Sequence, residues 1–361
     1  MGGVNGAAGS RLPDPLFWRG KRVLLTGHTG FKGAWASLWL KRLGADVHGL
    51  ALAPTQPRSL YGLACVPDDL SADLRIDIRD RAAVAKAVED AAPEIVLHLA
   101  AEALVRRAAR QPVETYDVNV MGTAHLLEAL RTCKTVKTVL IVTSDKVYRN
   151  LDDGRAFGED DPLGGHDPYS ASKAAQDILA RSYAETYLST QGVALATARG
   201  GNVIGGGDFS EDRIIPDIWR ALEQGAAPAL RSPNATRPWQ HALDCLSGYF
   251  LFTEDLHAGV LQEETLNFGP APDAPVSVAE LTQSFLSHFD SGSDWTHDAA
   301  DGPKEMALLS IDAEKARSVL NWGDRLQGRA AIKMTAAWYG ALFSGEDMGA
   351  VTRRQLETYA S

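Results

Sequence analysis

The sequence contains few cysteines, no long apolar run and no excess of positive charge. The three cysteines, Cys65, Cys133 and Cys245, are too few and too scattered for a disulfide framework or a metal site. No apolar run reaches the roughly 20 residues of a membrane-spanning helix. The formal net charge of -10 argues against a surface that binds nucleic acid or anionic membrane, because such surfaces need basic patches. We therefore expect a cytoplasmic protein with no metal, no nucleic-acid partner and no membrane partner.

The length and composition are those of an ordinary globular protein. Of the 361 residues, 45% are hydrophobic and 23% are charged. This length suggests two domains, or one large domain with an attached lobe. Residues 1–16 begin with neither the apolar core nor the early basic cluster of a signal peptide, so we expect a disordered leader there.

A glycine-rich turn follows the first predicted strand, residues 21–26, and opens the helix predicted over residues 34–43. It reads Gly27-His28-Thr29-Gly30-Phe31-Lys32-Gly33. Gly27 can form the tight turn, Gly30 lets backbone approach a pyrophosphate, and Gly33 allows close helix packing. Placed between a strand and an amphipathic helix, this pattern predicts a dinucleotide site at the helix N-terminus.

Further predicted strands alternate with helices along the first 200 residues. They cover residues 47–52, 74–78, 94–99, 139–142 and 193–199. Strands and helices that alternate at this spacing indicate a parallel, doubly wound α/β sheet of the Rossmann type. The fourth strand runs into Ala100 and Ala101, small residues over which a cofactor could lie closely.

The second strand does not decide between NAD and NADP. An NAD enzyme usually shows an acidic residue here that binds the adenosine ribose. The strand instead ends in Ala51-Leu52-Ala53-Pro54, and Arg58 follows. Asp77, at the end of the third strand, is a candidate for the adenine edge, although a turn-forming aspartate is an equally good interpretation.

Chemically active side chains gather between residues 139 and 173. The apolar, β-branched fifth strand ends at Ser144, Asp145 and Lys146, and strand ends of this kind face the cleft in open α/β sheets. Tyr169 and Lys173 lie four residues apart on one face of a predicted helix. A nearby ammonium lowers a phenol pKa and makes the phenol a better base. Taken alone, either group could be structural; their place downstream of a nucleotide signature favours catalysis.

The character of the chain changes after residue 200. A loop with the sequence Gly-Asn-Val-Ile-Gly-Gly-Gly-Asp over residues 201–208 would expose backbone N–H groups to a ligand. Arg213, Arg231 and Arg237 follow, either as clamps for a diphosphate or as plain surface charge. We expect a dinucleotide-binding domain over residues 17–200 and 241–270, a smaller C-terminal α/β substrate lobe over 201–240 and 271–342, and a tail over 343–361.

Together these motifs resemble a known family. The spaced glycines and the Tyr169–Lys173 pair resemble the extended short-chain dehydrogenase/reductase superfamily. More narrowly, the glycine turn, Thr143-Ser144-Asp145-Lys146, and the segments 164–169, 201–208 and 237–241 resemble the CDP-glucose 4,6-dehydratases. The resemblance covers residues 17 to 339, and the last two segments are its most specific motifs.

The resemblance implies an NAD cofactor that is reduced and reoxidised within one turnover. Tyr169 would take the proton from the sugar O4 while hydride leaves C4. Lys173 would hold the cofactor ribose and lower the tyrosine pKa, and Ser144 would hydrogen-bond O4. Asp145 would be the acid for the departing C6 hydroxyl, and Lys146 the base or electrostatic partner at C5. The product would be a 4-keto-6-deoxy sugar.

The predicted binding residues fall into two groups. The cofactor contacts, besides Tyr169 and Lys173, are Gly27, Thr29, Gly30, Phe31, Lys32, Gly33, Asp77, Ile78, Ala100, Ala101 and Asn119. The contacts to the nucleotide sugar are Glu102, Asn202, Arg213, Arg231, Arg237 and His241. Glu102 departs from the family pattern, where we expect glutamine, and it adds a negative charge near the cleft.

Other functions remain open from the sequence. A nucleotide-sugar 4-epimerase shares the Tyr–Lys pair but needs no acid and base at C5 and C6, so Asp145-Lys146 favours dehydration. An NADPH-consuming reductase is less favoured, because the motifs expected to bind a substrate diphosphate would then have no function. A dehydratase for another base or sugar, or a catalytically silent sensor, is also possible. We expect a homodimer or a dimer of dimers, formed through helices over residues 113–130 and 168–188.

Overall fold

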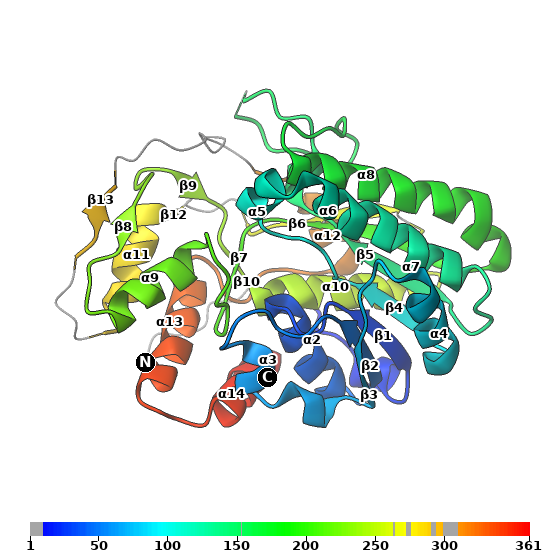
Figure 1. Cartoon of the computed structure of the whole chain (residues 1–361), viewed down its shortest axis with the longest axis horizontal. Coiled ribbons are helices and arrows are strands. Elements are labelled where there is room, and N and C mark those ends of the chain that lie inside the picture. Colours follow the sequence, from blue (N-terminus) through cyan, green and yellow to red (C-terminus); the bar gives the residue numbers. More distant parts are fainter. Residues whose placement is uncertain (1–9, 153, 263, 272–275, 290–293, 299–309) are drawn as a thin grey trace.

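A parallel sheet of seven strands, in the order β11-β6-β5-β4-β1-β2-β3, forms the centre of the chain (Figure 1). The computed structural model describes residues 10–152, 154–262, 264–271, 276–289, 294–298 and 310–361. The strands are β1 (Arg22–Thr26), β2 (Asp46–Ala51), β3 (Ala72–Arg75), β4 (Ile95–His98), β5 (Thr138–Val142), β6 (Ala194–Gly200) and β11 (Thr265–Phe268). This confirms the predicted doubly wound α/β fold, because the strand order reverses between β1 and β4.

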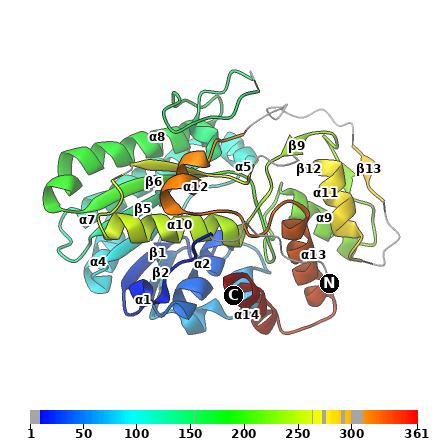
Figure 2. The same cartoon turned by 180° about the vertical axis from the view of Figure 1, so that it is seen from behind.

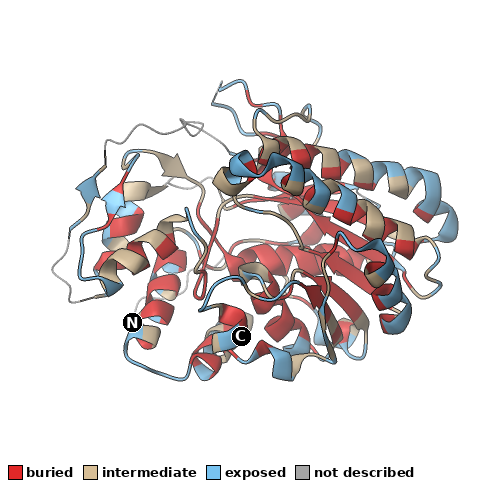
Figure 3. Ribbon diagram, viewed as in Figure 1, coloured by how far each residue is buried: buried red, intermediate tan, exposed pale blue. Residues whose placement is uncertain are grey.

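Both faces of the sheet are buried, so successive residues of a strand enter different cores. In β1, Val23 and Leu25 join one apolar cluster and Leu24 joins the other, and all three are fully buried. Figure 3 shows the central strands buried along most of their length, whereas the edge strand β3 is partly exposed. Burial on both sides explains why these strands are continuous apolar runs without a polar alternation.

Two layers of helices cover the sheet (Figures 1 and 2). The helices α2 (Phe31–Arg42) and α10 (Ala242–His257) contribute to one core. The helices α4 (Arg81–Ala91), α7 (Thr123–Leu130) and α8 (Pro168–Tyr183) pack on the other. Shorter turns connect them: α1 (Pro15–Trp18), α3 (Leu60–Leu63), η1 (Val66–Asp69), α5 (Val105–Arg110), α6 (Pro112–Tyr116), η2 (Asp117–Gly122), η3 (Asp145–Val147), η4 (Ala184–Leu188) and η5 (Ser189–Gln191).

A smaller lobe of short strands and helices lies beside the carboxyl ends of the sheet strands (Figure 1). Its strand pairs are β7 (Val203–Ile204) with β10 (Gln240–His241), β8 (Ala229–Leu230) with β13 (Thr296–His297), and β9 (Thr236–Arg237) with β12 (Val276–Ser277). Its helices are α9 (Ile214–Glu223), α11 (Val278–Leu286) and α13 (Arg329–Phe343), while α12 (Glu314–Leu320) lies against β11. The sheet and this lobe therefore meet where ligands bind in such folds.

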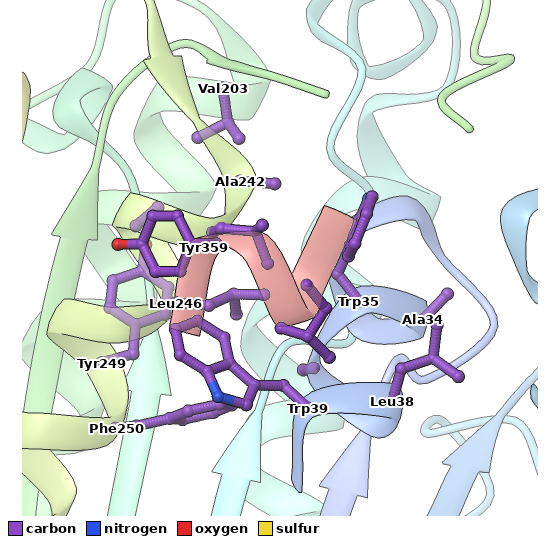
Figure 4. Packing of buried hydrophobic residues seen from close by; sticks show 14 of the residues in the cluster. Ala34, Trp35, Leu38, Trp39, Val203, Ala242, Leu246, Tyr249, Phe250 and Tyr359 are labelled. Atoms are coloured by element: carbon purple, nitrogen blue, oxygen red, sulfur yellow. The ribbon is translucent and has the colours of Figure 1, made fainter. Parts of the chain in front are cut away.

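The two ends of the described chain pack closely on α10, so residues 10–16 of the expected disordered leader are ordered and the expected tail is a docked helix. The helix α14 (Met348–Ala360) places the Tyr359 hydroxyl 2.8 Å from Asp244, to which it donates. The Tyr359 ring also meets Trp39 edge to face (Figure 4). At the other end, Arg11 forms ion pairs with Glu254 and Asp255. Residues 1–9 of the expected leader lie outside the described residues.

Candidate active site

The glycine turn between β1 and α2 has no room for a side chain at Gly27 or at Gly33. Gly27 has a φ of +76°, and a Cβ atom there would lie 2.7 Å from the Ala100 nitrogen. A Cβ on Gly33 would lie 2.1 Å from the Gly27 carbonyl oxygen. Gly30 is the N-cap of α2 and supplies no side-chain cap to the first N–H groups of the helix. This bare helix N-terminus, with close backbone around it, fits a pyrophosphate.

The end of β2, where the adenosine ribose is expected, is shaped mostly by backbone. Thr29 donates its hydroxyl proton to the Leu52 carbonyl, at 2.9 Å. Arg58 makes a two-bond contact with Glu223 of α9, with distances of 2.5 and 3.0 Å. Because the Glu223 carboxylate already pairs with the Arg58 guanidinium, Arg58 gives no support for binding the 2'-phosphate of NADP.

Asp77 forms a turn, as in the second of our two interpretations. Its Oδ1 accepts the Arg79 N–H at 2.9 Å, and both carboxylate oxygens bind the Arg79 side chain. This contact lowers the pKa of Asp77. The third strand also ends earlier than predicted, at Arg75. Ile78 is buried and lies against Gly122, where a Cβ would approach within 2.5 Å of the isoleucine.

The first turn of α2 reaches toward the lobe. Phe31 packs on Gly205 of the predicted ligand loop, where a Cβ would lie 3.0 Å from the phenylalanine ring. The Lys32 ammonium lies 5.6 Å from the centre of the Tyr249 ring. Its positive charge also helps to lower the pKa of Lys173. The charge on the first turn of α2 therefore acts on Lys173 of α8.

Ser144 and Asp145 are buried at the carboxyl end of β5. Ser144 caps the turn η3, accepts the Lys146 N–H at 3.2 Å, and donates its hydroxyl proton to Asp145 at 2.9 Å. A Cβ on Gly201 would lie 3.4 Å from the second Asp145 oxygen. The structure thus brings the Ser-Asp-Lys turn against the start of the loop 201–208.

Tyr169 lies at the first turn of α8, which begins at Pro168 and is capped by Asp167. Burial raises the pKa of the Tyr169 phenol to about 12, although a hydrogen bond with Ser144 and the charge of Arg213 lower it. Our expectation of a lowered phenol pKa is therefore wrong for this structure. Desolvation by the surrounding protein outweighs the favourable contacts.

Lys173 is the group whose pKa falls. Its ammonium donates to the Val142 carbonyl at 3.2 Å and to the Gln176 side-chain oxygen at 2.8 Å. Burial and the nearby charge of Lys32 lower the Lys173 pKa to about 7. This ammonium is therefore close to its titration point at neutral pH.

Asn119 holds two parts of the site together from the π-helical turn η2. Its side chain accepts the Glu102 N–H at 2.8 Å and donates to the Glu102 carbonyl at 3.1 Å. It also donates to the Ser172 hydroxyl on α8, at 2.9 Å. The Glu102 carboxylate pairs with Arg107 at 3.2 Å, so its extra negative charge is balanced within the protein. Ala101 lies partly buried in the bend just before it.

The predicted arginines lie on the lobe side of the site. Arg213 is 3.7 Å from Asp208, and Arg231 is 4.0 Å from Asp212. Arg237 is on β9, where it donates to the Thr236 carbonyl. These guanidinium groups are partly exposed, and guanidinium is the side-chain group that best binds a phosphate through two parallel hydrogen bonds.

The other two predicted sugar-nucleotide contacts are more enclosed. His241 is fully buried, and its Nδ1 accepts the Leu243 N–H as the N-cap of α10. Burial lowers the pKa of His241 to about 3. Its Nε2 atom and the Asn202 amide nitrogen have no hydrogen-bond partner among the described residues. His241 therefore has a structural role that the sequence motif did not reveal.

Comparison with known proteins agrees with this geometry. The family model described as GDP-mannose 4,6 dehydratase matches residues 24–335. The chain belongs to this family. It is 40% identical, over 96% of its length and 98% of that protein, to CDP-glucose 4,6-dehydratase of Salmonella typhimurium. It is 28% identical, over 73% of its length and 77% of that protein, to dTDP-glucose 4,6-dehydratase 1 of Escherichia coli.

Solved structures share the fold of this dehydratase-family chain at lower identity. A UDP-glucose 4-epimerase of Thermotoga maritima has a TM-score of 0.75 and 18% identity, covering 89% of this chain and 99% of that one. A dTDP-glucose 4,6-dehydratase of Bacillus anthracis, solved with NAD, has a TM-score of 0.72 and 21% identity, covering 91% and 99%. Epimerases and dehydratases thus share the scaffold, and the site residues must distinguish them.

In the structure, Lys173 is surrounded by buried polar residues that the sequence analysis did not single out. Gln176, Thr123 and His98 are buried and form a hydrogen-bonded chain that ends at the lysine. Gln176 lies three residues after Lys173, so helical spacing alone could have placed the two side chains together. His98 and Thr123 give no comparable local signal, because they come from other elements.

Proposed function

We propose that this chain is a CDP-glucose 4,6-dehydratase that converts CDP-D-glucose to CDP-4-keto-6-deoxy-D-glucose and water. The observation that carries the proposal is the Ser144-Asp145-Lys146 turn placed against Tyr169. Ser144 and Asp145 both lie close enough to the Tyr169 phenol to act on its pKa, which Ser144 lowers and the Asp145 charge raises. An acid-bearing turn next to a Tyr–Lys pair suits elimination of water after oxidation. The identity with the Salmonella enzyme, over nearly the full length of both chains, supports the same conclusion.

Tyr169 and Ser144 serve the oxidation step at the sugar C4. Tyr169 takes the O4 proton, and Ser144 hydrogen-bonds the same oxygen. Because burial holds the phenol pKa at about 12, base action needs nearby positive charge. Lys173, one helical turn away, and Arg213 supply that charge. The nicotinamide of a bound NAD supplies the acceptor and later donor of the hydride, and the glycine turn fits its pyrophosphate.

Asp145 and Lys146 serve the elimination step. The C4 ketone acidifies the C5 proton, and Lys146 takes this proton. Asp145 gives a proton to the departing C6 hydroxyl, so that the C6–O bond breaks and water leaves. The hydride removed from C4 then returns to C6, and C5 takes a proton from solvent, which gives the 4-keto-6-deoxy sugar. Lys146 is less buried than Asp145, which lets its side chain meet a sugar at the mouth of the site. A 4-epimerase would not use this pair.

NAD is the cofactor that we propose for this chain. The bare N-terminus of α2 fits a pyrophosphate, and Arg58 is bound to Glu223. The Bacillus anthracis relative was solved with NAD. Arg213, Arg231 and Arg237 are the proposed contacts to the substrate diphosphate, together with Asn202 at the start of the loop 201–208.

The test is a substrate panel. Purified protein is incubated with CDP-, dTDP-, GDP- and UDP-glucose, and the 4-keto-6-deoxy product is measured by its absorbance in alkali. We expect the fastest formation of the 4-keto-6-deoxy product from CDP-glucose. Product only from another nucleotide sugar would correct the base, and conversion of CDP-glucose to its C4 epimer would replace the dehydratase by an epimerase.

We also propose a homodimer in which α6, η2 and α8 form the contact. Large apolar side chains are exposed there: Val113 by 73%, Met121 by 48% and Ile178 by 58%. Leu126, Leu127 and Leu130 lie within the expected contact helix 113–130, but they are fully buried in the core of the protein itself. Exposed apolar groups gathered on neighbouring helices are typical of an interface. A further pairing of dimers remains a prediction.

The cytoplasmic location likewise stays a prediction. Among the helices that the structure describes, none combines the length and the apolar character needed to cross a membrane.

A further inference from the structure

A continuous chain of buried hydrogen bonds connects the nucleotide turn to Lys173. It runs from Thr26 at the end of β1, through His98 on β4 and Thr123 on α7, to Gln176 and Lys173 on α8. The donor–acceptor distances along it are 2.6, 2.9, 2.8 and 2.8 Å in that order. None of these side chains is more than 2% exposed. Water therefore does not compete for the partners, and each bond must be satisfied within the chain.

The chemistry of the partners fixes the direction of the bonds, beginning at Lys173. A charged lysine has donors only, so the oxygen of the Gln176 amide must face it and the amide nitrogen must face Thr123. The Thr123 hydroxyl donates its single proton to the Asn119 carbonyl, at 2.8 Å. Thr123 can therefore only accept from its other neighbours.

The same reasoning fixes His98. Its Nε2 must carry the proton, because Thr123 accepts there. Its Nδ1 is then a bare acceptor, and the Thr26 hydroxyl donates to it. Thr26 in turn accepts the Ala100 N–H at 3.1 Å, in the backbone that encloses the glycine turn. Burial, with a smaller contribution from the Lys173 charge, lowers the pKa of His98 to about 3, so the ring is neutral as this pattern requires.

We propose that Gln176 is a positioning residue whose amide oxygen is held toward Lys173 by Thr123 and His98, and that it thereby keeps Lys173 charged and fixed in place, one helical turn from Tyr169 on α8. The proposal rests on the proposed function, in which the Lys173 charge assists Tyr169. It assigns to Gln176, His98 and Thr123 a task that neither the Tyr–Lys pair nor the Ser-Asp-Lys turn performs.

The charge balance at Lys173 explains why such support is needed. Burial opposes the ammonium, and Lys32 on α2 adds like-charge repulsion. Asp177 on α8 acts in favour of the charge, but Arg199 already binds both oxygens of its carboxylate. His98, on β4, is neutral. The Val142 carbonyl and the Gln176 oxygen are therefore the direct acceptors that stabilise the charged form.

Substitutions of Gln176 separate this role from simple packing. Gln176→Glu places a carboxylate beside the ammonium, which we expect to raise the Lys173 pKa by about 1–3 units. Gln176→Leu removes the acceptor, so we expect a fall of about one unit. A residue needed only for packing would not shift the lysine in opposite directions in these two variants.

Thr123→Val tests the hydrogen bonds that orient the Gln176 side-chain amide. Valine cannot accept from Gln176 or His98, so the amide loses its fixed orientation and we expect the Lys173 pKa to fall. Thr197→Val is the matched control, because Thr197 is equally buried and bonds Thr265 on the remote edge strand β11. The control should leave the Lys173 pKa unchanged.

The experiment measures the Lys173 pKa by NMR in protein labelled with ¹⁵N at lysine, without substrate, and the resonance is assigned by its loss in Lys173→Met. The expected result is a higher pKa with Gln176→Glu, a lower pKa with Gln176→Leu and Thr123→Val, and no change with Thr197→Val. Equal values in the two Gln176 variants, or an unchanged Thr123→Val, would overturn the proposal. The alkaline limb of the pH profile of kcat/KM should move in the same directions. Because the NMR titration needs no turnover, a missing dehydratase activity would count against the proposed function alone.

Discussion

Replacing Lys173 by methionine should make the protein more stable at slightly acid pH. The Lys173 pKa is lowered from 10.5 to about 7, mainly by burial. At about 1.4 kcal/mol for each pKa unit, the charged ammonium costs the folded state about 5 kcal/mol. Methionine leaves the Gln176 oxygen and the Val142 carbonyl without the lysine donor, which together costs about 1–3 kcal/mol. The expected net gain in the free energy of unfolding is about 2–4 kcal/mol below pH 7.

The stability gained by the methionine variant depends on pH through the protonation of Lys173 in the parent protein. Between pH 7 and 10.5 the unfolded chain binds more protons at Lys173 than the folded chain does, so the stability of the parent protein rises with pH in that window. The advantage of the methionine variant is therefore full below pH 7 and shrinks as the pH rises toward 10.5.

Thermal and urea unfolding at pH 6.5 and pH 9.5 check the prediction. Lys86→Met is a suitable control, because the Lys86 side chain is 65% exposed and pairs with Asp90 at the surface. We expect a higher midpoint for Lys173→Met at pH 6.5, a smaller difference at pH 9.5, and little change for the control. A Lys173→Met variant that is less stable than the parent at pH 6.5 would show that the buried Lys173 charge does not destabilise the folded protein.

Three further predictions concern catalysis and assembly. Tyr169→Phe should lower kcat by roughly 10²–10⁴, as expected for a lost general base, with substrate binding little changed; near-normal turnover would remove Tyr169 from the mechanism. Lys146→Ala should still allow oxidation at C4, so that reduced nicotinamide absorbance accumulates on the enzyme while little product is released. If Lys146 were only structural, stability would fall without that signal. The wild-type protein should have a dimeric mass at micromolar concentration, and Ile178→Lys should shift it toward monomer; a monomeric wild type would contradict the interface.

The sequence predicted the sheet well because local signals and tertiary burial agree there. The glycine turn follows β1 directly, and Gly27 and Gly33 lie in contacts that leave no room for a Cβ. The fifth strand and α8 also lie where hydrophobic pattern and capping residues put them, with Asp167 as the N-cap. Strand type was predictable from apolar, β-branched runs, since both faces of the sheet are buried.

What the sequence did not show depends on contacts between distant parts of the chain. Tyr359 meets Asp244 across 115 residues, and this contact docks the C-terminal helix on α10. His241 belongs to a binding-type motif, and its ring also caps α10 inside the core. The Tyr169 pKa depends on how deeply α8 is covered, which spacing from Lys173 cannot show. Burial is a property of the whole fold, and a local motif does not report it.

The chain Thr26–His98–Thr123–Gln176–Lys173 illustrates the same limit for the site. Only Gln176 and Lys173 are neighbours at helical spacing. The other members meet because β1, β4 and α7 lie side by side in the folded protein. Sequence motifs therefore gave the proposed catalytic groups, and the structure was needed to find which residues surround them.

Conversion of CDP-glucose in deuterated water, followed by NMR of the product, tests the central claim most directly. The proposed elimination removes the C5 proton and replaces it from solvent after water has left. The account predicts a CDP-4-keto-6-deoxy sugar that carries one deuterium at C5. A product that retains its original hydrogen at C5, or a C4 epimer with the C6 hydroxyl intact, would contradict the assignment of Asp145 and Lys146 to dehydration.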